Sequence, residues 1–223
     1  MNTSLARRLV GALLVTLWVA APAAAQDYES LNRTDQLARL DPGSRSAIES
    51  ILDSARASGL PTEPLLSKTL EGISKRADNR RIVTKVREVY AALREARSAL
   101  GANASRDELS AAAGALQAGV PATMLARFRS AHAKPVTVPL VVLADLITRG
   151  VPRDTASNTI MQLWQGGAAD GDFLGLWRGV ERDIVSGAPP AVALMQRARE
   201  YPARAAPTGR APGTPPQPET PSP

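Results

Sequence analysis

Residues 101–121 read GANASRDELSAAAGALQAGVP, a stretch with signals for both ends of a helix. Ser105 and Glu108 have the spacing of a capping box, in which each residue satisfies a backbone N–H of the other at a helix N-terminus. The apolar residues that follow recur three and four apart, as on one buried helix face: Leu109, Ala113 and Leu116. Gly119 can take the left-handed conformation that ends a helix, and Pro121 is favoured at the start of the next. The stretch predicts a short helix joined to another by a tight corner.

The same corner recurs along the chain in the form Gly-x-Pro. Its four copies have glycines spaced by 60, 31 and 37 residues: Gly59-Leu60-Pro61, Gly119-Val120-Pro121, Gly150-Val151-Pro152 and Gly187-Ala188-Pro189. Gly101-Ala102-Asn103 has the glycine without the proline. Spacings of 31 and 37 residues fit a repeated pair of short helices. An alanine-rich bundle can also use such corners without repetition, so both interpretations stay open.

The rest of the chain shows helical spacing of apolar residues and no alternation typical of a strand. Asp41, Asp78 and Asp172 stand where helix N-caps are expected, and Pro121 and Pro139 are expected to begin helices. We predict an all-α fold of about eight or nine short helices joined at Gly-x-Pro corners. These helices are expected to form either an irregular α-solenoid or an orthogonal helical bundle.

The first 25 residues have the pattern of a secretory signal peptide. Two arginines precede an apolar run over residues 9–20, and three alanines at 23–25 form a small-residue cleavage site. We expect cleavage between Ala25 and Gln26, which places the mature protein in the periplasm or outside a bacterial cell. An uncleaved membrane anchor is the alternative. The paired arginines leave Sec and twin-arginine export open.

The remaining chain divides by composition into two parts. Residues 26–201 are expected to form one all-helical domain, with a sub-boundary left open near 101–105. No stretch in this part is apolar over a membrane-spanning length, so we expect no span after cleavage. Residues 202–223 hold eight of the 18 prolines, and we expect a disordered tail there.

The composition excludes several kinds of chemistry. The chain has no cysteine and a single histidine, His132, so thiol nucleophiles, disulfides and multi-histidine metal sites are excluded. We expect no cofactor and no metal. The net charge is +6, with 27 basic and 21 acidic residues, which is mild for this length. Nucleic acid is therefore not an expected partner.

The candidates for catalysis are isolated carboxylates. Glu63, Glu71 and Glu88 could serve an envelope enzyme that cleaves cell-wall glycan, although none sits in an aromatic, sugar-stacking neighbourhood. His132 could act as a general base, but its place at a helix end favours a cap. The segment Asp170-Gly171-Asp172 resembles the start of a calcium loop, but the residues after it are apolar and favour a helix start.

The most distinctive surface feature is the basic helix expected over residues 75–97. Arg80, Arg87 and Arg94 are seven apart and form one line, beside an acidic line of Glu88 and Glu95. Such arginines can bind an anionic polymer, lipid head groups or an acidic protein. The alternative is an ordinary solvated face of mixed charge.

These observations favour an exported helical interaction or scaffold protein of the bacterial cell envelope. It has no identifiable catalytic site, and its protein partner is unknown. One alternative is a cell-wall glycan hydrolase or lyase that uses a carboxylate. Another is an anion-binding module that uses the basic helix 75–97.

Overall fold

The computed structural model describes residues 37–201, and within this range the chain forms helices and turns without a strand. The predicted all-α fold is confirmed. The predicted signal peptide, its cleavage site and the proline-rich tail lie outside the described residues. The bounds of the helices are α2 (Pro42–Ala57), α3 (Glu63–Ser74), α4 (Asn79–Leu100), α5 (Arg106–Gln117), α6 (Ala122–Ala131), α7 (Thr137–Thr148), α8 (Arg153–Gln165), α9 (Asp170–Val185) and α10 (Pro190–Ala198).

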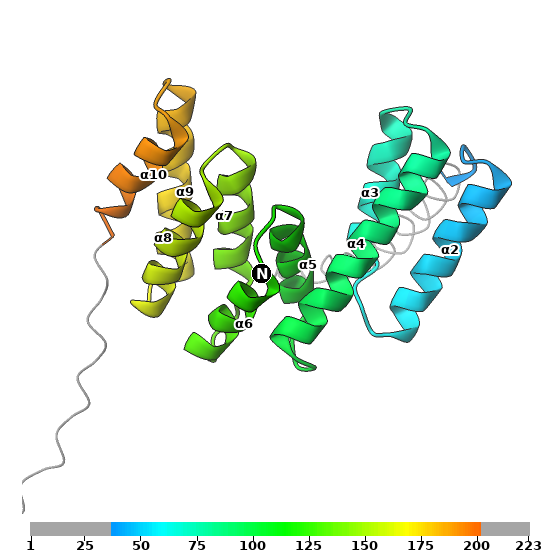
Figure 1. Ribbon diagram of the computed structural model, residues 1–223, viewed down its shortest axis with the longest axis horizontal. Coiled ribbons are helices and arrows are strands. Elements are labelled where there is room, and N and C mark those ends of the chain that lie inside the picture. The colour runs from blue at the N-terminus through cyan, green and yellow to red at the C-terminus, as the bar shows by residue number, and fades with distance from the viewer. Residues whose placement is uncertain (1–36, 202–223) are drawn as a thin grey trace, which may run out of the picture.

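The helices stand in a row from α2 to α10 (Figure 1). Even-numbered helices pack on the next even-numbered helix along the row, and α5, α7 and α9 pack on one another in the same way. Pairs such as α3 with α4, α7 with α8 and α9 with α10 join the two sets. Extensive contacts therefore connect each helix only to helices one or two places away in the chain, which is the arrangement of a two-layered α-solenoid.

The glycines of the four Gly-x-Pro corners have positive φ as the sequence predicts, but their prolines lie before the next helix and not at its first position. Pro121, Pro152 and Pro189 are N-cap residues, and α3 begins two residues after Pro61. At the corner between α5 and α6, Gly119 has φ of 91°, a value that favours glycine. The Gly119 N–H donates to the Leu116 carbonyl at 2.9 Å, and the Val120 N–H donates to the Ala115 carbonyl at 3.0 Å. This pair of bonds is a Schellman motif, and it buries Val120 in the core.

The corners lie on two different edges of the row. Gly119, Gly150 and Gly187 follow odd-numbered helices, whereas Gly59 follows the even-numbered helix α2. The spacings of 31 and 37 residues, from Gly119 to Gly150 and from Gly150 to Gly187, therefore each contain one pair of helices. The spacing of 60 residues from Gly59 to Gly119 contains three helices. The matching corner between α3 and α4 has Arg76 at φ of 51° in place of glycine, so the Gly-x-Pro pattern does not mark it.

Helix starts follow local signals, with small shifts. Asp41 and Asp78 cap α2 and α4 as predicted, and Ser105 and Glu108 form the capping box of α5. Proline is tolerated throughout a first turn, where the backbone N–H needs no intrahelical acceptor. Accordingly, α7 begins at Thr137, two residues before Pro139.

The predicted cap of α9 is displaced in the same way. This helix begins at Asp170, with Ala169 as its N-cap residue. The Asp172 carboxylate accepts the Ala169 N–H at 2.8 Å from inside the first turn. Asp172 thus stabilises the helix start, but from the third helical position rather than from the N-cap.

The core is made of alanine and branched aliphatic side chains, with one aromatic cluster. Trp164 packs against Phe128 and Phe173, with ring centroids 6.3 Å apart in each pair. The Trp164 indole N–H donates to the Phe128 carbonyl at 2.9 Å. This cluster joins α6, α8 and α9, so the three large side chains connect both layers.

Candidate functional site

The structure places Arg80, Arg87 and Arg94 on the solvent-exposed side of α4, and we call this set the arginine row. Successive members are separated by about 10.5 Å along the helix axis, so the row spans about 21 Å. Within residues 37–201, none of the three guanidinium groups has a hydrogen bond or an ion pair. Among the described residues, the row is therefore a line of positive charge without an acidic partner.

Two other arginines tie a helix to a distant corner. Arg97 at the C-terminal end of α4 donates to the carbonyl of Gly59 at 3.0 Å, and Arg153 donates to the carbonyl of Gly119 at 3.3 Å. Each of these bonds ties a helix to a corner more than 30 residues earlier in the chain. The arginine row differs from them because its members contact no carbonyl or carboxylate in the described part of the chain.

The three carboxylates considered for glycan cleavage lie apart and face basic groups. Glu71 accepts hydrogen bonds from Lys68 and Lys75, each at 2.6 Å. These bonds, Lys68 first, lower the pKa of Glu71 to about 2, so this carboxyl is ionised at neutral pH. Glu88 pairs with Lys85 at 2.7 Å, and Glu63 lies 3.8 Å from Arg106.

Glu108 is a buried carboxylate whose long-range partners the sequence does not indicate. Its side chain is 7% exposed and accepts the Ser105 N–H at 2.9 Å and the Val136 N–H at 3.1 Å. Arg129 adds a short ion pair. Burial raises the pKa of Glu108, but the backbone N–H groups of Ser105 and Val136 and the Arg129 guanidinium outweigh burial and lower it. Glu108 is therefore an anionic clamp between α5, the end of α6 and the start of α7.

Like the partners of Glu108, a polar cluster between α7 and α9 has no signal in the sequence. The Trp177 indole N–H donates to Asp145 at 2.6 Å, and Arg149 pairs with both Asp145 and Glu181, the latter at 2.9 Å. The Arg149 guanidinium also lies 5.6 Å from the Trp177 ring centroid, in cation–π contact. Each polar group in this cluster has a partner, so the cluster stabilises the packing of α7 on α9.

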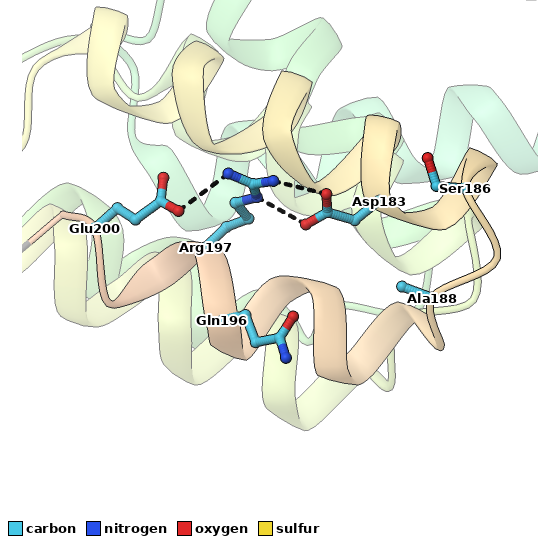
Figure 2. Close-up of a pocket in the computed structure, with 6 residues that line it drawn as sticks. All are labelled: Asp183, Ser186, Ala188, Gln196, Arg197 and Glu200. Carbon is cyan, nitrogen blue, oxygen red and sulfur yellow. Dashed lines mark hydrogen bonds and ion pairs between the residues drawn. The ribbon is translucent and has the colours of Figure 1, made fainter.

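A shallow pocket lies between α9 and α10 (Figure 2). Arg197 projects into it and binds Asp183 through two hydrogen bonds, both of 2.7 Å, and Glu200 at 3.0 Å. The Arg197 hydrogen bonds lower the pKa of Asp183, and Asp183 raises the pKa of Arg197 in return. The charged groups of this pocket compensate one another and join the last two helices.

His132 and the Asp170–Asp172 segment serve helix ends. The His132 Nε2 lies 2.7 Å from the Trp164 carbonyl oxygen, so it must carry the proton and donate to the end of α8. That nitrogen is therefore not available as a base. Between residues 37 and 201, no group of three or more histidine, aspartate or glutamate side chains is placed to hold a metal ion.

None of the described helices combines the length and apolarity needed to cross a bilayer. Comparison with known proteins finds no matching family model, no matching curated protein and no matching solved structure.

Proposed function

We propose that this chain is an exported, non-catalytic interaction scaffold of the bacterial cell envelope. The observation that carries the proposal is that some charged side chains join helices to one another, whereas the arginine row does not. Glu108, Asp145 and Asp183 are bound to basic and N–H groups that hold neighbouring helices together. The arginine row, in contrast, faces solvent along α4 without a partner in the described residues.

This pattern favours binding over catalysis. A general acid for glycan cleavage needs a raised pKa, and burial among apolar side chains is the usual cause. The pKa values of Glu71 and Glu108 are lowered instead, because each accepts several hydrogen bonds. A row of stacked helix pairs also offers long exposed faces, and proteins of this architecture use such faces to bind partners.

Export is inferred from the sequence of residues 1–25. The test is expression of the full chain in a bacterium, followed by cell fractionation and mass spectrometry of the protein's N-terminus. We expect periplasmic or secreted protein that begins at Gln26. A full-length chain retained in the cytoplasm would contradict export.

A photo-crosslinking amino acid placed at Ser98 on α4 tests the scaffold itself. We expect one discrete protein adduct in living cells, lost when Arg80, Arg87 and Arg94 are changed to alanine. Incubation with purified cell-wall sacculi provides the test against the enzyme alternative. Soluble glycan fragments released by the wild type and lost in Glu71→Gln or Glu88→Gln would refute the non-catalytic proposal.

A second candidate function is binding of anionic groups by α4, and the unpartnered arginine row favours it. The basic helix expected over residues 75–97 corresponds to α4, which begins at Asn79, so Lys75 and Arg76 lie in the preceding corner. The test is retention on immobilised heparin at low salt. We expect the triple alanine variant of Arg80, Arg87 and Arg94 to elute at clearly lower salt than the wild type, because exposed guanidinium groups bind sulfate and phosphate well. Unchanged elution would end this candidate.

A further inference from the structure

We propose that the exposed face of α4 docks a helix of a partner protein, and that this helix carries a line of acidic residues beside a line of basic residues. The inference rests on the proposed scaffold function and specifies its partner chemistry. It is drawn from the way that charges of both signs are arranged on α4.

The first element of the surface is the arginine row. Residues seven apart on a helix drift by only about 20° around the axis, so Arg80, Arg87 and Arg94 form a nearly straight line. All three side chains are exposed. An acidic residue every seven positions on a second helix has the same spacing of about 10.5 Å, so the two lines can face each other along their whole length.

The second element is the line of opposite charge on the same face. Glu88 and Glu95 are exposed and also seven apart, on the other side of this face from the arginine row. Glu88 is paired with Lys85 at 2.7 Å, whereas the Glu95 carboxylate has no partner within the described helices. Over residues 87–95 the surface is therefore striped, with Glu88 and Glu95 running parallel to Arg87 and Arg94; the exposed Arg81 lies seven residues before Glu88 and places a positive charge at the start of the acidic side.

The stretch between the two lines has short side chains. Thr84, Ala91 and Ser98 are exposed there, again seven residues apart. Short side chains allow the backbone of a neighbouring helix to approach, which brings long charged side chains on both helices within reach. The two charged lines then act as the flanking positions of a helix pair and determine which partner fits.

A striped partner fits this face better than a uniform polyanion does. A polyanion that follows the arginine row also meets the like charges of Glu88 and Glu95, which costs binding free energy. A helix with one acidic and one basic line meets opposite charge along the arginine row and at Glu88 and Glu95. The acidic line of α4 therefore separates the two ligand classes.

The experiment uses two synthetic helical peptides of identical composition and zero net charge. One carries three glutamates and three lysines in two parallel lines at seven-residue spacing, and the other has the same residues with the lines scrambled. Binding to the full mature chain is followed by fluorescence anisotropy at low salt. We expect the striped peptide to bind about tenfold more tightly, from several exposed ion pairs that each contribute a small amount.

Variants then assign the contact to α4. Replacing Arg80, Arg87 and Arg94 with alanine is expected to reduce binding of the striped peptide to the level of the scrambled one. The matched control replaces three exposed arginines on separate elements, Arg39, Arg178 and Arg199, which removes the same charge. This control variant is expected to bind the striped peptide as the wild type does. Equal losses in both variants would overturn the proposal.

The variant Glu95→Lys distinguishes a striped helix from a polyanion as the ligand of α4. It is expected to weaken the striped peptide severalfold and to strengthen binding of heparin, with unchanged circular dichroism. If Glu95→Lys leaves the peptide affinity unchanged, or if the two peptides bind equally, the inference is refuted. These results do not depend on the sacculus assay or on the cellular adduct at Ser98, so a failed inference is separable from a failed scaffold function.

Discussion

Removing the Glu108 carboxylate should cost more stability than removing any surface ion pair of this chain. In Glu108→Ala, the backbone N–H groups of Val136 and Ser105 lose their acceptor, and Arg129 loses its ion pair. The Ser105 bond is one of the two hydrogen bonds of the capping box. An unsatisfied buried N–H costs about 1–3 kcal/mol and a lost cap about 1 kcal/mol. When the unpaired Arg129 guanidinium is included, we expect the free energy of unfolding to fall by about 3–4 kcal/mol.

Urea unfolding followed by far-ultraviolet circular dichroism measures this loss. The wild type and the variant should have equal slopes and different midpoints if only stability changes. The matched control is Glu71→Ala, because Glu71 also joins two basic side chains but is 41% exposed. Its expected cost is below about 1 kcal/mol. If Glu108→Ala costs no more than Glu71→Ala, the assignment of Glu108 as the clamp between α5, α6 and α7 is wrong.

Acidification, loss of Lys68 and substitution of two glycines give three further tests of the fold. The pKa of Glu108 is lowered in the folded state, so its contribution to the free energy of unfolding is complete above the ordinary carboxyl pKa and is lost as pH falls through the folded pKa. Unfolding measured between pH 7 and 3 should therefore show that Glu108→Gln loses less stability on acidification than the wild type. Carbon-13 NMR titration should give Glu71 a midpoint of about 2, and Lys68→Ala should raise it, whereas an unchanged midpoint would contradict the role of that lysine. Gly119→Ala should destabilise the chain by about 1 kcal/mol or more because of its positive φ, while Gly114→Ala in open space within α5 should stabilise it by up to about 1 kcal/mol, as measured by thermal unfolding.

Local features of the fold could be predicted because their causes are local. The cap at Asp78, the capping box at Ser105 and the corner at Gly119 each depend on residues within one turn of a helix. The arginine row was predictable for the same reason, since seven-residue spacing places side chains on one line of any helix. The positive φ of Arg76 was missed because no residue type marks it in the sequence.

The long-range hydrogen bonds of the carboxylates could not be predicted because they join positions about one helix pair apart. Glu108 meets Val136 28 residues later, and Asp145 meets Trp177 32 residues later. Those partners are brought together by the stacking of α5 on α7 and of α7 on α9. Composition and spacing reveal neither which layers stack nor in which register, so the long-range partners of Glu108 and Asp145 had no signal in the sequence.

The restriction of contacts to near neighbours along the row has a mechanical consequence. No extensive contact joins α2 to α10, so the two ends of the described array are connected mainly through the helices between them. Small changes in angle between successive pairs add up along its length. A bound partner can therefore alter the curvature of the whole array by tilting one pair, without disrupting the packing within any other.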